Sequence, residues 1–548
     1  ERLYYKQALA IAKRNNRLSG EVSILCNLGS AYLSLGDYTQ AISFSRQSLE
    51  KAENTEDKRC TPRSLNNIGT SLFELGKLEE AEKSLQQALK YFEETRSFLG
   101  DNDDFKISIF DEQVSAYLDL QKVLIAQNKT DEALKISERG RARAFVELLA
   151  KRLANQDNSF PATITPPNIE QIKQIAQQQN ATLVEYSLIY DQGEEAELFI
   201  WVVKPTGEIT FRRSNLKPLW QQENTSLAKL VTHTRIALGV QGLPLRSLNR
   251  DIVAIQPRPG FEPYKNGLNR LHQLLIDPIA DLLPTDPNEK VIFIPQSSLF
   301  LTPFPALQDE QGNYLIEKHT ILTAPSIQTL QLTREQKQKT TATGDALVVG
   351  NPTMPKVKDD PLEPAIQLAS LPGAEKEALA IAPLLNTQPL TGNEATKSTI
   401  VKQMASANII HLATHGLLDD VQGMGSGIAL APDSSPGNGL LTATEIYDMN
   451  LQANLVVLSA CNTGRGKITG DGVIGLSRSF ISAGVPSVLV SLWAVPDAPT
   501  GELMVEFYNQ LEKNPDKAQA LRQAMLATMK QHPEPRNWAA FTLIGESD

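Results

Sequence analysis

The sequence reads Asn-Ile-Ile-His-Leu-Ala-Thr-His-Gly at residues 408–416 and Asn-Leu-Val-Val-Leu-Ser-Ala-Cys-Asn-Thr-Gly at residues 454–464. Each segment is an apolar run of strand length that ends on a reactive side chain, His415 in the first and Cys461 in the second. Buried parallel strands bring their last residues to the carboxyl edge of a sheet, where open α/β folds place their sites. The two segments therefore predict two such strands, on which a cysteine nucleophile and a histidine base could meet.

Spacing alone leaves other interpretations open for both side chains. Positions 411 and 415 of one strand point to the same face, so His411 is an alternative to His415 as the base. The deeper position of His411 in the strand instead favours a hydrogen-bonded core histidine. A single cysteine on a buried strand is usually inert packing, which is the alternative for Cys461. The glycine-rich segment 462–472 favours the reactive interpretation, because it exposes the strand end.

The chain around these segments alternates between expected strands and helices. Strands are expected at 346–350, 408–414, 427–431, 454–460 and 487–493, and helices at 373–385, 395–405, 442–449, 472–483, 498–512 and 516–530. Thr442 and Glu445 fit a capping box, and Asp471 and Asp516 stand at N-cap positions. Such alternation predicts a mostly parallel sheet between helical layers.

The preceding segment adds strand-like runs at 182–189, 198–203, 209–212 and 290–295, around a mostly helical stretch at 216–283 with loop-like parts near 239–266. Residues 333–344 are polar and predict a loop. That loop and the proline-rich segment 352–373 are either ordinary surface loops or sites of proteolytic processing. His319 is expected to be a surface or packing histidine.

The N-terminal part of the chain contains a repeat with an offset of 40 residues. Leu28-Gly29, Leu35-Gly36 and Ala41 recur as Ile68-Gly69, Leu75-Gly76 and Ala81. The pattern resembles a slightly lengthened tetratricopeptide repeat, which predicts a helical solenoid with a protein-binding face. A weaker third copy turns at Asn128, and its second helix is expected to continue to about Leu153. The sequence begins in what resembles mid-helix, so the first repeat is expected to be incomplete.

Composition narrows the class of protein. The chain has 548 residues, 41% of them hydrophobic, and a net charge of −10 without a basic run, which argues against direct nucleic-acid binding. No apolar stretch approaches the length of a membrane span. Three cysteines are few and odd in number, which indicates a reducing compartment, and we expect a cytoplasmic protein. No Cys or His spacing suggests a metal, and no cofactor is expected.

Five motifs make the chain similar to the CHAT family of caspase-like and separase-like cysteine peptidases, which often follow tetratricopeptide repeats. They are His-Leu-Ala-Thr-His-Gly at 411–416, Leu-Ser-Ala-Cys-Asn-Thr-Gly at 458–464, Ser-Leu-Trp-Ala-Val-Pro-Asp at 491–497, and the segments 472–480 and 291–307. The separation of 461 − 415 = 46 residues is close to the spacing of about 50 in caspases.

The resemblance implies a multi-domain chain, with an all-α tetratricopeptide solenoid followed by an α/β caspase-like CHAT domain that has a mostly parallel sheet between helices. The expected parts are the repeat domain at 1–153, a polar, proline-rich linker at 154–170, a non-catalytic caspase-like half at 171–340 and a catalytic half at 341–548.

The resemblance also implies the site. His415 would be the base and Cys461 the nucleophile, and the backbone N–H groups of Gly416 and Cys461 would bind the oxyanion. Ser491 and Trp493 would line the substrate site, with core packing as the alternative for Trp493. Asp471 and Asp497 would either bind a basic side chain of the substrate or cap helices.

The expected function is therefore that of a cysteine endopeptidase of the caspase or separase type. It would cleave protein substrates and be regulated through a protein partner of its repeats, and it could be latent until that partner binds. The alternative is a non-enzymatic, protein-binding scaffold with a caspase-like remnant.

Overall fold

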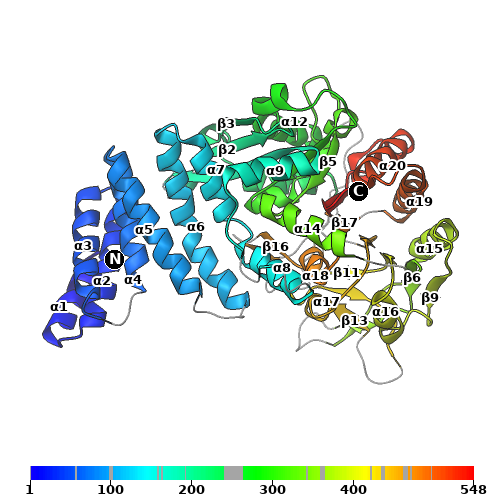
Figure 1. Ribbon diagram of the computed structural model, residues 1–548, viewed down its shortest axis with the longest axis horizontal. Coiled ribbons are helices and arrows are strands. Elements are labelled where there is room, and N and C mark those ends of the chain that lie inside the picture. The colour runs from blue at the N-terminus through cyan, green and yellow to red at the C-terminus, as the bar shows by residue number, and fades with distance from the viewer. Residues whose placement is uncertain are drawn as a thin grey trace. The chain divides into compact units, whose positions relative to one another are not determined.

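A computed structural model describes residues 2–55, 59–97, 103–156, 160–161, 164–191, 193–239, 263–340, 344–357, 364–419, 423–433, 439–460, 467–469, 472–494 and 496–548. The chain divides into two compact units (Figure 1). The helical unit comprises Glu1–Ala144, Pro166–Ile169 and Ser187–Ala196, and the α/β unit comprises Phe145–Thr165, Glu170–Tyr186 and Glu197–Asp548.

The helical unit stacks helices side by side (Figure 1). Its helices are α1 Arg2–Arg14, α2 Leu18–Ser34, α3 Tyr38–Ala52, α4 Cys60–Glu74, α5 Leu78–Ser97, α6 Asp103–Ala126 and α7 Thr130–Arg139. The repeated glycines have two roles. Gly29 and Gly69 let paired helices approach, because a Cβ atom there would collide with Ser45 and Leu85 respectively. Gly36 and Gly76 both have a φ of +74°, which glycine adopts without steric cost.

The third repeat corrects one prediction. A helix running through to Leu153 was expected, but α7 ends at Arg139 and a separate helix, α8, spans Arg143–Gln156. Gly140 leaves no room for a Cβ atom beside the Tyr117 ring, and Ala142 has a left-handed φ of +46°. The break lies just before the division between the two units, at Ala144 and Phe145.

The α/β unit is built on an 11-stranded sheet with the order β3-β2-β1-β4-β5-β18-β17-β14-β10-β6-β9. In that order the strands are Ile209–Asn215, Glu194–Val203, Ala181–Asp191, Lys290–Ile294, Thr320–Thr323, Phe541–Gly545, Ser487–Ser491, Leu455–Leu458, Ile409–Ala413, Leu347–Pro352 and Pro389–Gly392. The expected α/β fold with a mostly parallel sheet is confirmed.

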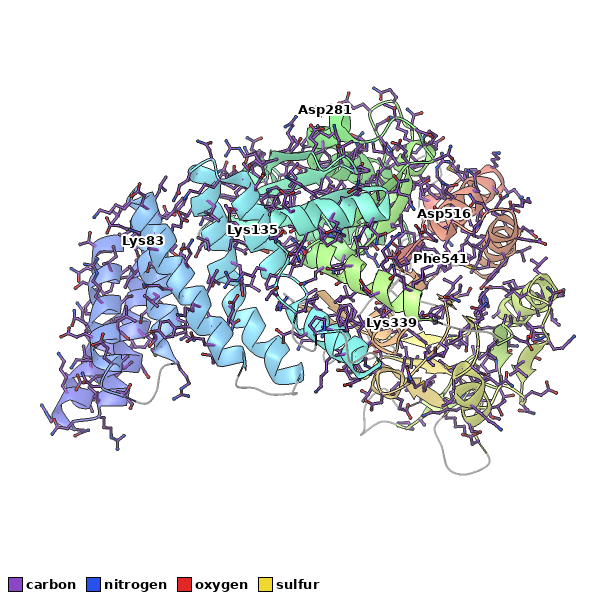
Figure 2. The ribbon with its side chains drawn as sticks, in the orientation of Figure 1. Lys83, Lys135, Asp281, Lys339, Asp516 and Phe541 are labelled. Atoms are coloured by element: carbon purple, nitrogen blue, oxygen red, sulfur yellow. The ribbon has the colours of Figure 1, made fainter. Side chains whose placement is uncertain are left out.

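Nine of the eleven strands form two parallel sets that run in opposite directions, and β2 and β3 form an antiparallel pair at one end of the sheet. β1, β4, β5 and β18 are parallel to one another, and so are β17, β14, β10, β6 and β9. β17 and β18 are antiparallel and join the two sets. Phe541, which is labelled in Figure 2, begins β18. Only 1% of its surface is exposed. The carboxyl edges of the two sets therefore lie at opposite edges of the sheet.

Helices and short 3-10 turns complete the unit. The helices are α9 Ile169–Gln179, α10 Lys217–Gln221, α11 Leu227–Ala237, α12 Pro263–Leu275, α13 Leu315–Lys318, α14 Ile327–Lys339, α15 Pro372–Leu384, α16 Lys397–Met404, α17 Ala443–Tyr447, α18 Leu476–Ser482, α19 Asp497–Lys513 and α20 Lys517–Gln531. The 3-10 turns are η2 Asp277–Leu282, η3 Ser297–Leu301, η4 Phe304–Ala306 and η5 Pro535–Asn537. The capping box at Thr442 and the N-cap at Asp516 are confirmed.

Three small antiparallel sheets lie outside the main sheet. They pair β11 Gly416–Leu417, β12 Gly427–Ala429 and β13 Leu440–Thr442; β15 Lys467–Thr469 and β16 Gly472–Ile474; and β7 Lys356–Val357 and β8 Ile366–Gln367. The strand expected at 427–431 thus belongs to a small sheet instead of the main one. The helix expected at 472–483 begins only at Leu476, after β16.

Other predictions also need correction. The loop expected at 333–344 is wrong for residues 333–339, which belong to α14. Strands β5, β9 and β18 were not predicted. Most of the loop-like part expected near 239–266 lies outside the described residues. Within the described part of the chain, no helix combines the length and apolar character needed to cross a bilayer.

Candidate functional site

The two strands that carry the candidate pair are neighbours. β10 and β14 are parallel, and Leu412 lies opposite Leu458, an offset of 458 − 412 = 46 positions that holds along the whole ladder. His415 and Cys461 are separated by the same 46 positions. His415 follows the carboxyl end of β10 by two residues. Cys461 lies outside the described residues, and the description of its segment ends at Ala460.

The His415 side chain is half-buried and held by a backbone group. Its Nε2 lies 2.8 Å from the carbonyl oxygen of Ala369. A carbonyl oxygen can only accept, so Nε2 carries the proton and Nδ1 is the acceptor of the neutral imidazole. The His415 carbonyl accepts from the N–H of Ala429 at 2.9 Å, which ties this position to β12. The ring is therefore oriented with a defined basic nitrogen.

Gly416 begins β11 and lies opposite Ile428 of β12. Because the ladder bond runs from Ala429 to His415, Gly416 and Ile428 form a non-hydrogen-bonded antiparallel pair. In such a pair the N–H groups point away from the neighbouring strand. The Gly416 N–H is thus directed away from β12.

His411 is the core histidine that its depth in the strand predicted. It is fully buried, with Nε2 at 2.9 Å from Oε1 of Glu377 and Nδ1 at 3.1 Å from the hydroxyl of Tyr508. Glu377 comes from α15 and Tyr508 from α19, two helices that pack together. Burial raises the pKa of Tyr508 well above its usual value, so the phenol stays protonated and can donate to Nδ1. Both ring nitrogens are engaged in the core, and the prediction is confirmed.

Ser491 lies at the carboxyl end of β17, the strand next to β14. It is fully buried, and its hydroxyl donates a hydrogen bond to the carbonyl of Ala460. Substrate contact was predicted for this residue. The structure places it inside the sheet instead, against the backbone that leads to Cys461.

Trp493 is also buried, with 1% of its surface exposed. Its Nε1–H donates to the carbonyl of Arg536 at 3.1 Å, and the Arg235 guanidinium lies 5.7 Å from its ring centre. Arg235 also donates to the carbonyls of Leu492 at 2.6 Å and Leu301 at 2.9 Å. The structure therefore gives Trp493 the core-packing position that was the alternative to a substrate-site wall.

The two predicted acidic residues have different positions. Asp471 lies outside the described residues. Asp497 is the first residue of α19, after Pro496 at the N-cap, and its side chain lies outside the described set. Among the side chains that the structure describes, no group of three or more His, Cys, Asp or Glu residues could hold a metal ion.

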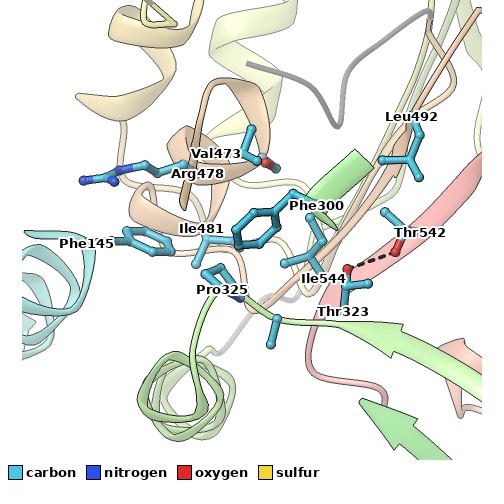
Figure 3. A pocket seen from close by; sticks show the side chains of 12 residues that line it. Phe145, Phe300, Thr323, Pro325, Val473, Arg478, Ile481, Leu492, Thr542 and Ile544 are labelled. Carbon is cyan, nitrogen blue, oxygen red and sulfur yellow. Dashed lines mark hydrogen bonds between the residues drawn. The ribbon is translucent and has the colours of Figure 1, made fainter. Parts of the chain in front are cut away.

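A pocket that is partly open to solvent lies in the α/β unit (Figure 3). Within it, the hydroxyls of Thr323 and Thr542 are 2.9 Å apart, and the Arg478 guanidinium lies 5.0 Å from the Phe145 ring centre. Its lining residues are Phe145, Phe300, Thr323, Ala324, Pro325, Val473, Ser477, Arg478, Ile481, Leu492, Thr542 and Ile544. Neither His415 nor Gly416 is among the described residues that line it.

Several residues that shape the site were not predicted from the sequence. The Ala369 carbonyl holds His415, and Glu377 and Tyr508 hold His411. A backbone carbonyl leaves no signal in the sequence, because every residue has one. Glu377 could have been suspected from its position on the apolar face of a predicted helix, where a carboxylate needs a partner.

Two curated relatives are similar to most of the chain. Tetratricopeptide repeat protein 28 of Mus musculus is 28% identical over 601 residues, which cover 87% of this chain and 24% of the relative. The Homo sapiens protein of the same name is 29% identical with the same coverage. The chain thus spans about a quarter of the length of these relatives.

Two solved structures resemble the fold. A chain in the crystal structure of the Saccharomyces cerevisiae separase–securin complex aligns with 99% of this chain. The alignment covers 48% of that other chain, at 13% sequence identity and a TM-score of 0.46. The structure of the Arg-specific cysteine proteinase gingipain R aligns with 52% of this chain. The alignment covers 67% of the gingipain chain, at 12% sequence identity and a TM-score of 0.33. The chain spans about half the length of the separase chain that it matches.

Two family descriptions match the sequence itself. The tetratricopeptide repeat matches residues 20–94, within the helical unit. The CHAT domain matches residues 265–546, which include both strands of the candidate pair and amount to more than half of the chain. The chain belongs to the CHAT domain family, and its CHAT domain follows tetratricopeptide repeats.

Proposed function

We propose that the CHAT domain is a cysteine endopeptidase of the caspase or separase type, with His415 as base and Cys461 as nucleophile. The observation that carries the proposal is the register of β10 and β14, whose offset of 46 positions equals the separation of the two residues. If the register continues beyond Leu412 and Leu458, the two side chains follow neighbouring strands at one carboxyl edge.

The proposed reaction starts at Nδ1 of His415, which takes the proton of the Cys461 thiol while Nε2–H stays bonded to the Ala369 carbonyl. The thiolate attacks the scissile carbonyl carbon, and the N–H groups of Gly416 and Cys461 hold the oxyanion. When the C–N bond breaks, the imidazolium returns the proton to the leaving amine. Water, deprotonated by the same imidazole, then cleaves the thioester and releases the acid.

We propose that the chain consists of four consecutive parts. Residues 1–153 would form the repeat domain and 154–170 the linker, with a non-catalytic half at 171–340 and a catalytic half at 341–548. The two oppositely directed strand sets of the sheet support two halves. Asp471 and Asp497 are proposed to recognise a basic substrate side chain, which a peptide library compared on wild type and the Asp→Asn variants would test.

The repeats are proposed to bind a regulatory protein that controls access to the CHAT domain. Tetratricopeptide solenoids present extended surfaces to partners, which supports this role. A protein substrate is the other proposed partner. We propose a cytoplasmic location, and fractionation of cells that express the chain would test it.

A thiol-reactive peptidyl probe tests the enzyme proposal. The chain has three cysteines, so a Cys26→Ser/Cys60→Ser background retains Cys461 as its one thiol. We expect the probe to label this background faster than it labels a small free thiol, and we expect His415→Gln to slow labelling about 100-fold. Equal labelling of wild type and Cys461→Ala would refute an enzyme that is active without a partner.

The alternative is a protein-binding scaffold without activity. It is favoured by the curated relatives, whose name refers to tetratricopeptide repeats and to no reaction. A latent enzyme would also be unlabelled when alone. Labelling that appears only after a protein that binds the repeats is added supports the latent enzyme, whereas no labelling in either condition supports the scaffold.

A further inference from the structure

Asn351 occupies the carboxyl end of β6, the strand on the far side of β10 from β14. Its φ of +46° is left-handed, a conformation that Asn adopts more readily than most residues. The ladder between β6 and β9 shifts its register at this point, between Gly350 and Pro352. The side chain is only 9% exposed, so its amide group needs partners within the protein.

Both ends of the Asn351 amide are bonded. Oδ1 accepts from the backbone N–H of Leu371 at 2.7 Å and from the hydroxyl of Ser370 at 3.1 Å. Nδ2 donates to Oε2 of Glu375 at 3.0 Å. One side chain thus ties the end of β6 to residues 370–371 and to the first turn of α15.

Residues 370–371 directly follow Ala369, whose carbonyl accepts from His415 at 2.8 Å. Ala369 and Ser370 are exposed, so apolar packing does little to fix them. Hydrogen bonds therefore set the position of this segment. Besides those to Asn351, the N–H of Leu368 donates to the carbonyl of Pro355 at 3.3 Å.

We propose that Asn351 is the positioning residue for His415. It holds residues 370–371 in place, and through them the Ala369 carbonyl that binds the His415 Nε2–H and aims the ring. A partner of the remote ring nitrogen fixes both the tautomer and the orientation of a histidine. The inference rests on the proposed function for its catalytic meaning, but the hydrogen bond itself can be measured without any activity.

The test is nuclear magnetic resonance of the ¹⁵N-histidine-labelled full chain. The chain has six histidines, and His415→Gln assigns the signal. In wild type we expect a hydrogen-bonded Nε2–H proton that exchanges slowly with water. In Asn351→Gly, which keeps the left-handed backbone and removes the amide, we expect exchange at least about ten times faster. The rate of Cys461 alkylation should fall with it.

Two further variants separate positioning from general destabilisation. Asn351→Asp combined with Glu375→Gln keeps an acceptor for Leu371 and Ser370 without placing two carboxylates side by side, and should restore slow exchange. Asn386→Gly replaces another left-handed Asn, with a φ of +53°, on the surface of the same unit, and should change nothing at His415. The buried His411 signals report whether each variant is folded.

The outcomes are distinct. Exchange as slow in folded Asn351→Gly as in wild type overturns the proposal. If that variant does not fold, Ser370→Ala is the deciding variant, because Ser370 is exposed and its hydroxyl makes one of the two hydrogen bonds to Asn351 Oδ1. In Ser370→Ala, exchange of the His415 Nε2–H that is about twofold faster supports the proposal. Unchanged exchange overturns it. Faster exchange together with a wild-type Cys461 that stays unlabelled even after a repeat-binding protein is added refutes the protease but leaves the role of Asn351 intact.

Discussion

The hydroxyl of Ser491 donates a hydrogen bond to the backbone carbonyl of Ala460. Ser491 ends β17, and Ala460 is the last described residue before Cys461. Both residues are buried, so the bond is shielded from water. A side chain of one strand therefore fixes the backbone of the next strand just where the candidate nucleophile is attached.

We expect Ser491→Ala to slow labelling of Cys461 about fivefold and to lower the free energy of unfolding by about 1–2 kcal/mol, since a buried carbonyl loses its donor. Ser487→Ala is the matched control. Ser487 begins the same strand, is also fully buried, and donates to the carbonyl of Glu546 at 2.7 Å. Equal slowing of labelling in both variants, measured beside urea unfolding, would contradict a specific role for Ser491.

The His411–Glu377 pair predicts strong energetic coupling between β10 and α15. His411→Leu leaves the Glu377 carboxylate buried without this partner, and we expect a loss of about 3–5 kcal/mol of stability. Replacing both residues with Leu should cost at least about 1 kcal/mol less than the sum of the single changes. Urea unfolding of the four proteins in this cycle measures the coupling. Additive losses would show that the two side chains do not support each other.

The sequence was sufficient to predict strands β10 and β14, which precede His415 and Cys461 in the chain. Their apolar runs are continuous, because both faces of a central parallel strand are covered. The same reasoning identified β6 and β17 and the helices between the strands. It also separated His411 from His415, since a histidine four residues deeper in a buried strand must find partners in the core.

Strand order and single backbone contacts could not be predicted. β18 pairs with β17 and β5, which lie about 50 and 220 residues earlier in the chain. The five residues of β18 contain no pattern that identifies such distant neighbours. The Ala369 carbonyl has no side-chain signature at all. The bend at Asn351 depends on the register of β6 with β9, which is a property of the folded sheet.

His319 predicts a loss of stability in mild acid. Burial, followed by the positive charges of Lys318 and Arg522, lowers its pKa from 6.5 to about 4. Its Nδ1 has no hydrogen-bond partner among the described residues, so no hydrogen bond at Nδ1 offsets the free-energy cost of protonating the buried ring. The unfolded chain therefore binds the proton more tightly between pH 6.5 and pH 4, and stability falls as the pH decreases through this window.

From pH 7 to pH 5 we expect His319 to account for about 2 kcal/mol of lost unfolding free energy. His319→Gln cannot take up this proton, so its stability should fall less over the same interval. Urea unfolding at the two pH values measures the difference. Parallel curves for wild type and His319→Gln would contradict the assignment.

Gly416 allows the proposed oxyanion donor to be removed without breaking the small sheet. Its N–H is directed away from β12, so Gly416→Pro removes the donor and keeps the bond from Ala429 to the His415 carbonyl. Loss of one such donor costs about 10²–10³ in rate. We expect that loss in the acylation of Cys461 by a peptide ester. Gly416→Ala keeps the N–H and should retain most of the rate.

Proline also restricts the residue before it, so Gly416→Pro could act by turning His415 instead of by removing a donor. The Nε2–H signal of His415 separates the two effects, because it reports the bond to Ala369. A slow-exchanging signal in a Gly416→Pro protein of low activity assigns the loss to the donor. Full activity of Gly416→Pro, or equal losses in the Pro and Ala variants, would instead mean that the Gly416 N–H does not bind the oxyanion.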